Sequence, residues 1–481
     1  MWRKKLNMAK QAMQAEKGAL SNKQVNIYGS YLMFSSLAAM VQMTYLTIFM
    51  TDTLMISAGV VATTLLIARA IDLVIGILSG GIIERSHLKW GRYRSWLLLG
   101  RWFIIFGIVC SFFDTSSWPM GFRVGVAFVG YIVLNVTFSF VTNAYYALAP
   151  CLAKGNMTDR FRLSARGAQF MCVAMLITSA LTVPLVTALT PVVGAGWGYM
   201  IVALIFAIPY IFGVQMLNGI TKECDPDNPE KVVVGPQITI KDMVLSVVKN
   251  NQMLVMFIAY SIYYIGLYTI QGLSTYYFMY IVGDYMKISV SMTITMITGT
   301  IASLFVPQLG KKLGKKRAFV SALVIYALAF ICVYFFVGGN WILYTVFGAI
   351  GGAFVYLFTG FGPNYFIDCG EYYLYKTGKD TRNIAIAMFS VPMKIGMMLG
   401  GAIAVYGLDA IGYRAGIQVT PEFQNHFMFL LGIIPSVLVL IGALVTGIFY
   451  KLTDEKAAFY AGENAKKMQE QMKAAKAGST E

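Results

Sequence analysis

Long apolar stretches alternate with short polar segments along most of this 481-residue chain. A stretch of 18 or more apolar residues can cross a hydrocarbon core about 30 Å thick as an α-helix. The alternating ten-residue segments of a membrane β-barrel are not seen. The pattern predicts an all-α membrane protein with twelve transmembrane helices. The predicted spans are 27–51, 56–83, 96–113, 121–149, 166–190, 195–219, 252–283, 288–309, 318–337, 341–366, 383–408 and 424–450.

One long hydrophilic segment, residues 220–251, separates the first six spans from the last six. Two helical bundles joined by such a linker are typical of secondary transporters built from repeats. The tail after the last span is rich in Ala, Lys, Glu and Gln, which predicts a soluble or interfacial helix with a frayed end. The predicted parts are a tail 1–26, a bundle 27–219, a linker 220–251, a bundle 252–450 and a tail 451–481.

Two loops at matching positions in the halves look alike. The loop after the second span contains Gly91-Arg92-Tyr93-Arg94, and the loop after the eighth contains Gly314-Lys315-Lys316-Arg317. Both are short, basic and carry glycine, which allows tight turns. Topology alone explains the charge, whereas an internal repeat also explains the matched positions. We expect a repeat, with these loops acting as latches between the bundles.

The placement of charge indicates topology. Only 12% of the residues are charged, against about 25% in soluble domains. The net charge of +16 would suit a nucleic-acid partner, but 32 of the 38 Lys and Arg residues lie in segments on one side of the predicted membrane. This bias predicts that both termini are cytoplasmic in a multi-pass cell-membrane protein that binds no nucleic acid.

Enzyme motifs are not found. The chain has no GxxxxGK[ST] loop, HExxH pair or nucleophile elbow, so neither an enzyme nor an ATP-driven pump is expected. The six cysteines have no CxxC spacing, and the two histidines are far apart in the sequence. No metal site or other cofactor is predicted.

Asp72 is the one carboxylate deep inside a predicted span. Charges in hydrocarbon cost several kcal/mol, roughly 2.5–3.5 on insertion scales, so they usually face protein or a wet cavity and mark a transport path. Arg69 lies one turn before Asp72 on the same helix face and can pair with it. The functional interpretation is a site for a coupling cation or proton, and the alternative is a structural ion pair.

Two further cations fall within spans. Lys394 follows Pro392 in the eleventh span, too deep to reach water, and is expected to face the central cavity. A fixed structural role is the alternative. Arg101 lies about two turns inside the third span and can face inward or extend to the cytoplasm.

Tyrosines, including Tyr146, are common in the spans, and sugar rings stack on aromatic rings. A single tyrosine is nevertheless more often a packing or interface residue. Asn143 and other amides inside spans fit helix–helix hydrogen bonds as well as ligand contacts.

Several motifs, in order, resemble the glycoside–pentoside–hexuronide:cation symporters of the major facilitator superfamily. They cover nearly all of residues 27–450. The matching pieces are Arg69-Ala-Ile-Asp72 with Trp90-Gly91-Arg92-Tyr93-Arg94, Thr158-Asp159 with Arg162 and Arg166, Tyr276-Tyr277-Phe278, Asp368-Cys-Gly-Glu371, and Lys394. The resemblance implies the two-bundle fold of that superfamily and alternating access to a central site.

The departures from that family change the expected substrate. The second aspartate of its typical cation site falls at Gly76, and its sugar-binding aspartates fall near Ser36 and near Thr142 or Asn143. Only Asp72 remains of these carboxylates, beside Arg69, Lys394 and Arg166. The excess positive charge attracts anions.

We therefore expect import of an anionic sugar derivative such as a hexuronide. One carboxylate makes a poor Na⁺ cage, so H⁺ coupling or uncoupled exchange is favoured over Na⁺. The alternatives are a lysolipid or amphiphile transporter, which would need an apolar lateral cleft, and an organic-anion exchanger. A receptor or scaffold would suit a chain with a large soluble domain.

The candidate residues fall into three groups, in a protein expected to be a monomer with a small-molecule substrate and lipid around it. Asp72 is the coupling-ion residue. The substrate and charge network is Arg69, Lys394, Arg101, Arg166, Tyr146, Thr142, Asn143 and Ser36. The cytoplasmic gate is Arg92, Arg94, Asp159, Asp368 and Glu371.

Overall fold

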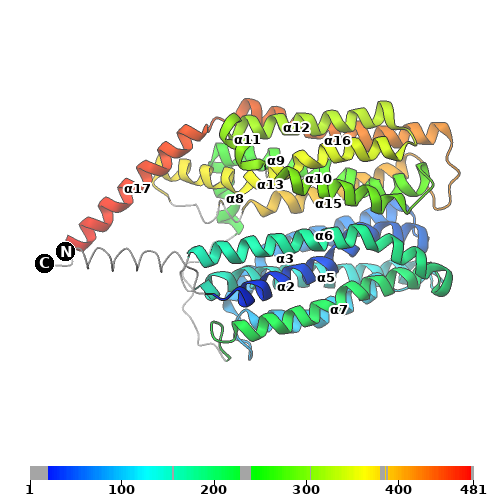
Figure 1. Cartoon of the computed structure of the whole chain (residues 1–481), viewed down its shortest axis with the longest axis horizontal. Coiled ribbons are helices and arrows are strands. Elements are labelled where there is room, and N and C mark those ends of the chain that lie inside the picture. The colour runs from blue at the N-terminus through cyan, green and yellow to red at the C-terminus, as the bar shows by residue number, and fades with distance from the viewer. Residues whose placement is uncertain are drawn as a thin grey trace. The chain divides into compact units, whose positions relative to one another are not determined.

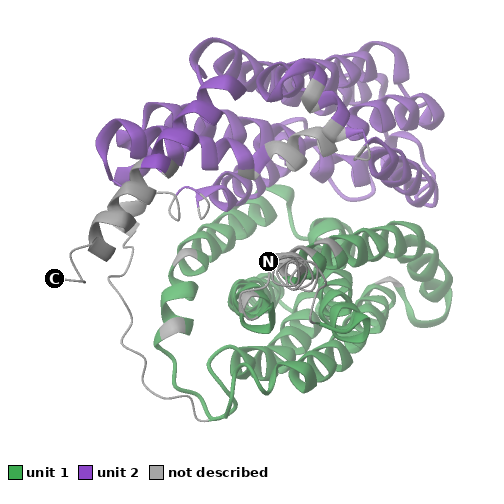
Figure 2. Cartoon of the chain, turned by 60° about the vertical axis from the view of Figure 1, so that its left-hand side comes forward, with its two compact units in different colours: residues 1–237 green, residues 238–481 purple. Residues whose placement is uncertain are grey.

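The computed structural model describes residues 20–153, 157–227, 240–303, 305–379, 385 and 388–477 (Figure 1). Within these residues the regular elements are helices, and no strand occurs. Two compact units are formed by residues 1–237 and 238–481 (Figure 2). The boundary between them falls inside the segment 220–251.

The first unit contains six long helices, each at a predicted span. Its first helix starts at a capping box, in which Ser21 and Gln24 bind each other's backbone N–H groups. The helices are α2 (Asn22–Ile48), which continues as the π-helical turn η1 (Phe49–Thr53), α3 (Ala58–Arg85), α4 (Arg94–Ser111), α5 (Met120–Ala153), α6 (Met157–Val193) and α7 (Ala195–Thr221).

The second unit repeats this plan with short additions. Side chains of Asn250, Asn340 and Thr420 accept backbone N–H bonds at the starts of α9, α13 and α16. The helices are α8 (Ile240–Lys249), α9 (Asn251–Tyr276) with η2 (Tyr277–Ile281), α10 (Lys287–Ser303), α11 (Val306–Leu313), α12 (Lys315–Cys332) with η3 (Val333–Val337), α13 (Trp341–Thr377), α15 (Ser390–Ala410), α16 (Pro421–Phe449) and α17 (Asp454–Ala477).

The helices have the same neighbours in both units. In the first unit, α2 packs against α6 and α7, while α5 packs against α3 and α4. In the second unit, α9 packs against α15 and α16, while α13 packs against α10 and α12. The repeat that the two basic loops suggested therefore extends to the packing order of the helices.

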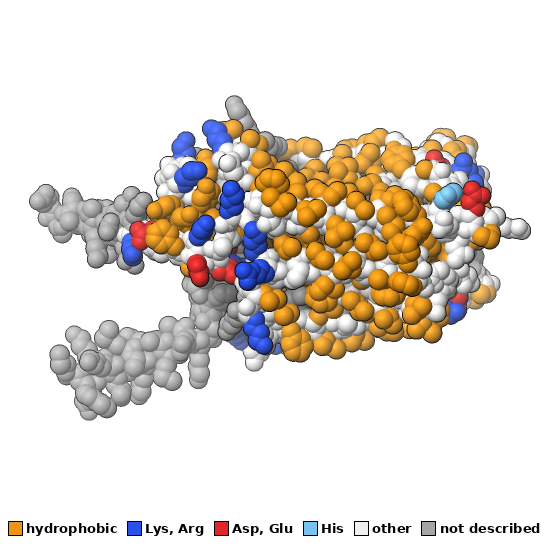
Figure 3. Space-filling view, turned by 90° about the horizontal axis from the view of Figure 1, so that it is seen from above, with side chains coloured by type: hydrophobic (Ala, Val, Ile, Leu, Met, Phe, Trp, Pro, Cys, Tyr) orange, Lys and Arg blue, Asp and Glu red, His pale blue; other side chains and the backbone are white. Residues whose placement is uncertain are grey.

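Membrane-spanning capacity agrees with the predicted topology. Among the described residues, ten helices are long and apolar enough to cross a membrane, and Trp341–Phe354 of α13 is a shorter apolar stretch. On the face shown in Figure 3, hydrophobic side chains cover the middle, and Lys and Arg side chains gather toward one end. The protein is an all-α, multi-pass membrane protein.

Several helices differ in extent from the predicted spans. The eighth span, expected to be continuous over 288–309, is divided into α10 and α11. The linker contains the amphipathic helix α8, and α13 continues to Thr377, well beyond the predicted end at residue 366. The C-terminal tail forms α17, which packs against α13.

Candidate functional site

Arg69 and Asp72 lie on α3 and both contact α5. Ser139 Oγ donates a hydrogen bond of 2.7 Å to Asp72 Oδ1. Arg69 Nε donates one of 2.8 Å to the hydroxyl of Tyr131. Both charged side chains are partly buried. The α3–α5 contact thus holds a cation and a carboxylate within protein, as expected for charges that must avoid hydrocarbon.

The polar face of α5 repeats every four residues: Tyr131, Asn135, Ser139 and Asn143. This spacing places all four on one side of the helix. Asn143 Nδ2 donates to the Ser79 hydroxyl at 2.7 Å. Asn143 therefore belongs to the same helix–helix contact as Asp72, farther along α3.

This polar face also reaches α2. Asn135 Nδ2 donates to Gln42 Oε1 at 3.3 Å, and Gln42 Nε2 donates to the Ser111 hydroxyl at 3.4 Å. Gln42 is buried. The network thus continues from α3 through α5 to α2 and α4.

Lys394 is partly buried in the second turn of α15. The helix starts after a turn at Phe389, and Pro392 lies in its first turn. Gly396 and Gly400 bring α15 close to α9: Thr269 Oγ1 donates to the carbonyl of Gly400 at 3.2 Å. Since each residue advances about 100° around a helix, Lys394 and Gly396 lie about 160° apart around α15, so they are on different faces of the helix.

Arg101 takes a different position from Arg69. Its Nη1 donates to Gln215 Oε1 on α7 at 3.2 Å, and its guanidinium lies 5.2 Å from the Trp102 ring centroid. The Trp102 side chain is 58% exposed. Arg101 therefore contacts the α4–α7 face, whereas Arg69 contacts α5.

The remaining substrate candidates spread over three helices. Ser36 is buried on α2, and Thr142 is partly buried on α5. Arg166 is exposed on α6, where its Nη1 donates to Gln169 Oε1 at 3.1 Å. Tyr146 is 56% exposed, unlike its neighbour Tyr145 at 1%.

Most of the other span tyrosines serve packing. Tyr145 stacks between Tyr28 and Tyr31, with centroids 4.3 and 4.8 Å away. Tyr263 and Tyr277 in the second unit are fully buried. Tyr146 is thus the most exposed of these tyrosines.

The loop before α4 is bound to the end of the first bundle by Asp225. Its Oδ1 accepts from the backbone N–H of Arg92 at 2.9 Å, and its Oδ2 accepts from those of Tyr93 and Arg94 at 2.8 Å. Gly91, with φ of +102°, allows the close approach. A carboxylate at a helix N-terminus also complements the helix dipole.

Arg94 reinforces this connection. Its Nε donates to Asn218 Oδ1 at 3.0 Å, its Nη1 to the carbonyl of Asp225 at 2.9 Å, and its Nη2 to Asp227 Oδ1 at 2.9 Å. The side chain is 3% exposed. All three guanidinium nitrogens therefore bind within the first unit.

Asp159 binds the start of the first helix. Its Oδ2 accepts the backbone N–H of Leu20 at 3.0 Å, and Arg162 Nη1 donates to its Oδ1 at 2.7 Å. Arg162 also donates to the carbonyl of Leu20 at 2.9 Å. Asp159 thus connects the starts of α6 and α2.

Asp368 and Glu371, both on α13, bind the start of α12 and the C-terminal helix α17. Lys315 Nζ contacts Asp368 and lies 3.4 Å from Asp454 Oδ1. Burial raises the pKa of the Asp368 carboxyl, and the Lys315 ammonium opposes that rise. Asn464 Nδ2 on α17 donates to Glu371 Oε2 at 2.7 Å. The C-terminal tail therefore makes specific contacts with the second bundle.

These contacts involve the basic loops and the predicted gate residues, whose role as latches stays a prediction. We expected them to act as latches between bundles. In this structure the bonds described for Arg94, Asp159, Asp368 and Glu371 each stay inside one unit. These hydrogen bonds and ion pairs connect helices of one bundle.

Sequence reasoning missed four residues of this arrangement. Tyr131 and Ser139 are residue types that are common in membrane spans. The signal that could have identified them is the polar residue at every fourth position of α5. Asp225 and Asp454 each follow the sixth helix of a half by a few residues, and this matching position in the two halves could have identified them.

Among the described residues, no group of three His, Cys, Asp or Glu is placed to hold a metal.

The family model described as MFS/sugar transport protein matches residues 27–454. The chain belongs to this family. It is therefore a membrane transporter rather than an enzyme, and its substrate is a small molecule.

Curated relatives match most of the chain. The glucuronide carrier protein homolog of Escherichia coli K12 is 27% identical, over 89% of this chain and 92% of its own length. The isoprimeverose transporter of Lactiplantibacillus pentosus is 28% identical over 79% of each chain. A putative sulfoquinovose importer of Salmonella typhimurium is 24% identical over 93% of each.

Solved structures agree on the fold. The nucleoside transporter NupG superposes with a TM-score of 0.60 at 16% identity, covering 89% of this chain and all of NupG. A bacterial homologue of the iron transporter ferroportin, in its inward-facing state, superposes with a TM-score of 0.63 at 14% identity. The superposition covers 90% of this chain and all of the ferroportin homologue. The fold is that of the major facilitator superfamily.

Proposed function

We propose that this protein imports an anionic sugar derivative by symport with a cation. The observation that carries the proposal is the α3–α5 contact, in which Asp72 is held by Ser139 and Arg69 by Tyr131, inside a member of a sugar transport family. Ionisable residues inside a membrane often mark ion pathways or proton relays.

Charge supports an anionic substrate. Arg69, Asp72 and Lys394 together carry one excess positive charge if all three serve the same transport path. Positive charge at low dielectric attracts anions strongly. Two of the relatives are named for sugars with an acidic group, a glucuronide and sulfoquinovose.

Coupling to H⁺ is favoured over Na⁺. Hard cations such as Na⁺ require several oxygen ligands, and the position one turn after Asp72 is Gly76 rather than a second acid. Asp72 and the Ser139 hydroxyl provide one carboxylate and one neutral oxygen at this place. A single carboxylate suffices to bind and release a proton.

The proposed cycle is alternating access, in which each six-helix unit moves as a body and Asp72 is loaded on one side and unloaded on the other. The protein acts as a monomer in the cell membrane with both termini in the cytoplasm. This orientation follows from the concentration of Lys and Arg in one set of loops.

The test is uptake into proteoliposomes containing the purified chain. A labelled glucuronide should accumulate under an inward H⁺ gradient, and neutral disaccharides should compete poorly. Asp72→Asn should abolish accumulation and leave counterflow, while Asp114→Asn, in the loop after α4, serves as the control. Efficient competition by neutral sugars would contradict the proposal that the substrate is anionic. Uptake driven by Na⁺ at fixed pH would contradict the proposal that H⁺ is the coupling ion.

A further inference from the structure

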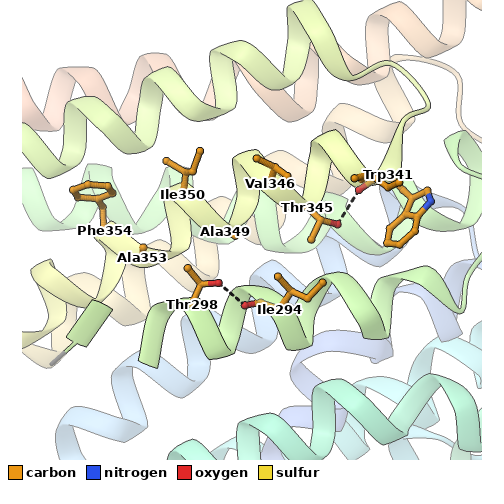
Figure 4. Close-up of a pocket in the computed structure, with 10 residues that line it drawn as sticks. Ile294, Thr298, Trp341, Thr345, Val346, Ala349, Ile350, Ala353 and Phe354 are labelled. Carbon is orange, nitrogen blue, oxygen red and sulfur yellow. Dashed lines mark hydrogen bonds between the residues drawn. The ribbon is translucent and has the colours of Figure 1, made fainter. Parts of the chain in front are cut away.

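A shallow groove of about 490 Å³ runs between α10 and α13. Figure 4 shows its lining, which comes from one face of each helix. Several of its side chains are exposed, with Ile342 at 56% and Val346 at 47%. The lining residues are Ile294, Thr298, Trp341, Ile342, Thr345, Val346, Ala349, Ile350, Ala353 and Phe354.

The groove offers almost no hydrogen-bonding groups. Its two hydroxyls bind carbonyls of their own helices, Thr298 to Ile294 and Thr345 to Trp341, each at 2.8 Å (Figure 4). The other lining side chains are apolar apart from the Trp341 indole N–H. A sugar in this groove would lose hydrogen bonds to water without replacement, which is costly. Hydrocarbon suits the surface.

One end of the groove is charged. Lys287 Nζ lies 5.6 Å from the centroid of the Trp341 ring, within cation–π range, and 3.3 Å from Asp284 Oδ2. Trp341 is the first residue of α13. Asp368, which Lys315 contacts, lies toward the opposite end of that helix. Trp and Lys at a helix end are typical of the membrane–water interface.

We propose that this groove binds one phospholipid, with an acyl chain along α10 and α13 and the head group at Lys287 and Asp284. Trp341–Phe354 contains fourteen residues and is about 20 Å of helix, close to the ~15 Å thickness of one leaflet's hydrocarbon. Because the Lys287–Asp284 pair presents both signs, the complementary head group is zwitterionic, with a phosphate and a primary ammonium as in phosphatidylethanolamine.

The site is separate from the proposed transport site. None of its residues belongs to the α3–α5 contact or to α15. The bound lipid would join α10 to α13, whose packing includes the close approach of Gly352 to Thr295. We expect this lipid to stabilise the second unit whatever the transported sugar is.

The experiment uses the full chain, purified and delipidated in detergent, with phosphatidylethanolamine added back. Native mass spectrometry should show one tightly bound lipid, and the lipid should raise the melting temperature. Ala353→Trp fills the groove and should remove both effects. Gly447→Trp is the matched control, since an added Cβ at Gly447 on α16 meets no atom within 4 Å.

Two further measurements locate the lipid. Phosphatidylethanolamine with brominated tails should quench the fluorescence of the unmodified chain more than that of Trp341→Phe, a mild change that serves even if Ala353→Trp fails to fold. Lys287→Gln should weaken lipid binding several-fold. Diacylglycerol, which has no phosphate, should bind poorly.

Three outcomes would overturn the proposal. Ala353→Trp could retain the bound lipid, which would place the lipid elsewhere. Diacylglycerol or an anionic phosphatidylglycerol could bind as well as phosphatidylethanolamine, which would exclude the zwitterionic recognition. The groove could instead hold a second copy of the chain, in which case a dimer of the unmodified protein would dissociate in Ala353→Trp.

Discussion

At the scale of single residues, Asp72 accepts a hydrogen bond from the Ser139 hydroxyl, which α5 supplies. A helix–helix hydrogen bond inside a membrane contributes about 0.6 kcal/mol on average, and at most about 1.7. The bond from Ser139 to Asp72 is therefore a small part of the stability of the first unit. Its larger effect is to fix the orientation of the carboxylate.

Ser139→Ala should separate these two effects. The variant should lose less than about 1.7 kcal/mol of unfolding free energy, while H⁺-driven accumulation falls markedly. Ser139→Thr, which keeps the hydroxyl, is the matched variant and should retain accumulation. Accumulation equal to that of the unmodified chain in Ser139→Ala would show that this contact has only a packing role.

Lys394→Gln should reduce affinity for an anionic sugar derivative. Loss of a cation from a substrate site should weaken binding by about tenfold, or about 1.4 kcal/mol, while binding of a neutral analogue stays nearly constant. Binding by isothermal titration measures both. Lys466→Gln, on exposed α17, is the control. Equal losses of affinity for the anionic and the neutral ligand would contradict a role of Lys394 in recognising the negative charge.

At the scale of elements, an aspartate after the sixth helix of each half caps the third helix of that half. Asp225 accepts three backbone N–H bonds before and at the start of α4. Asp454 Oδ2 accepts the N–H of Lys315, the first residue of α12, at 2.9 Å, beside Gly314 with φ of +74°. Each cap ties the third helix to the segment after the sixth.

Asp225→Asn and Asp454→Asn should both destabilise the protein. An amide has one acceptor oxygen and no charge, so the variants should lose about 1–3 kcal/mol of unfolding free energy, with Asp225→Asn the more severe. Thermal unfolding in detergent gives the comparison. Asp409→Asn, which breaks the exposed pair with Arg414, is the control and should cost less than about 1 kcal/mol.

Close packing of α15 on α9 depends on glycine. An added Cβ at Gly396 would lie 2.2 Å from the Cβ of Tyr264 and 2.7 Å from its backbone carbon. Gly396→Val should therefore force α15 outward, lower the unfolding free energy by about 1–3 kcal/mol or more, and displace Lys394. Gly447→Val should be nearly neutral, since its Cβ meets nothing within 4 Å. Similar melting temperatures for both variants would contradict this packing.

At the scale of the whole molecule, each unit is stabilised by contacts among its own helices. The helix contacts described above, the aspartate caps and the described bonds of Arg94, Asp159 and Glu371 each join parts of the same unit. Two self-contained units are the structural requirement for bundles that move as bodies.

Separate chains for residues 1–237 and 238–481, expressed together, should therefore restore uptake to a measurable fraction of that of the intact protein. A control split between residues 116 and 117, which separates α4 from α5, should abolish it because those helices pack closely within one unit. Uptake in cells that express either pair measures both. Inactivity of the first pair together with activity of the second would contradict the independence of the units.

Much of the fold was readable from the sequence because hydrocarbon demands long apolar helices. The twelve stretches each contain a helix, and the charge of the loops marked one end of the molecule. The candidate site was only partly readable. Asp72 and Lys394 could be identified because charged residues are rare in membrane spans. Serine and tyrosine are common there, and Ser139 and Tyr131 gain their role only from their hydrogen bonds to Asp72 and Arg69.

The sequence by itself determined the helices, their order and the family, since hydropathy and motif order are properties of consecutive residues. Tertiary structure decided which groups meet: that α5 holds Asp72 and Arg69, that Asp225 and Asp454 cap helices distant in sequence, and that α17 binds Glu371. Hydrogen bonds extend only about 3 Å. Their partners are therefore set by how helices pack, which no single segment encodes.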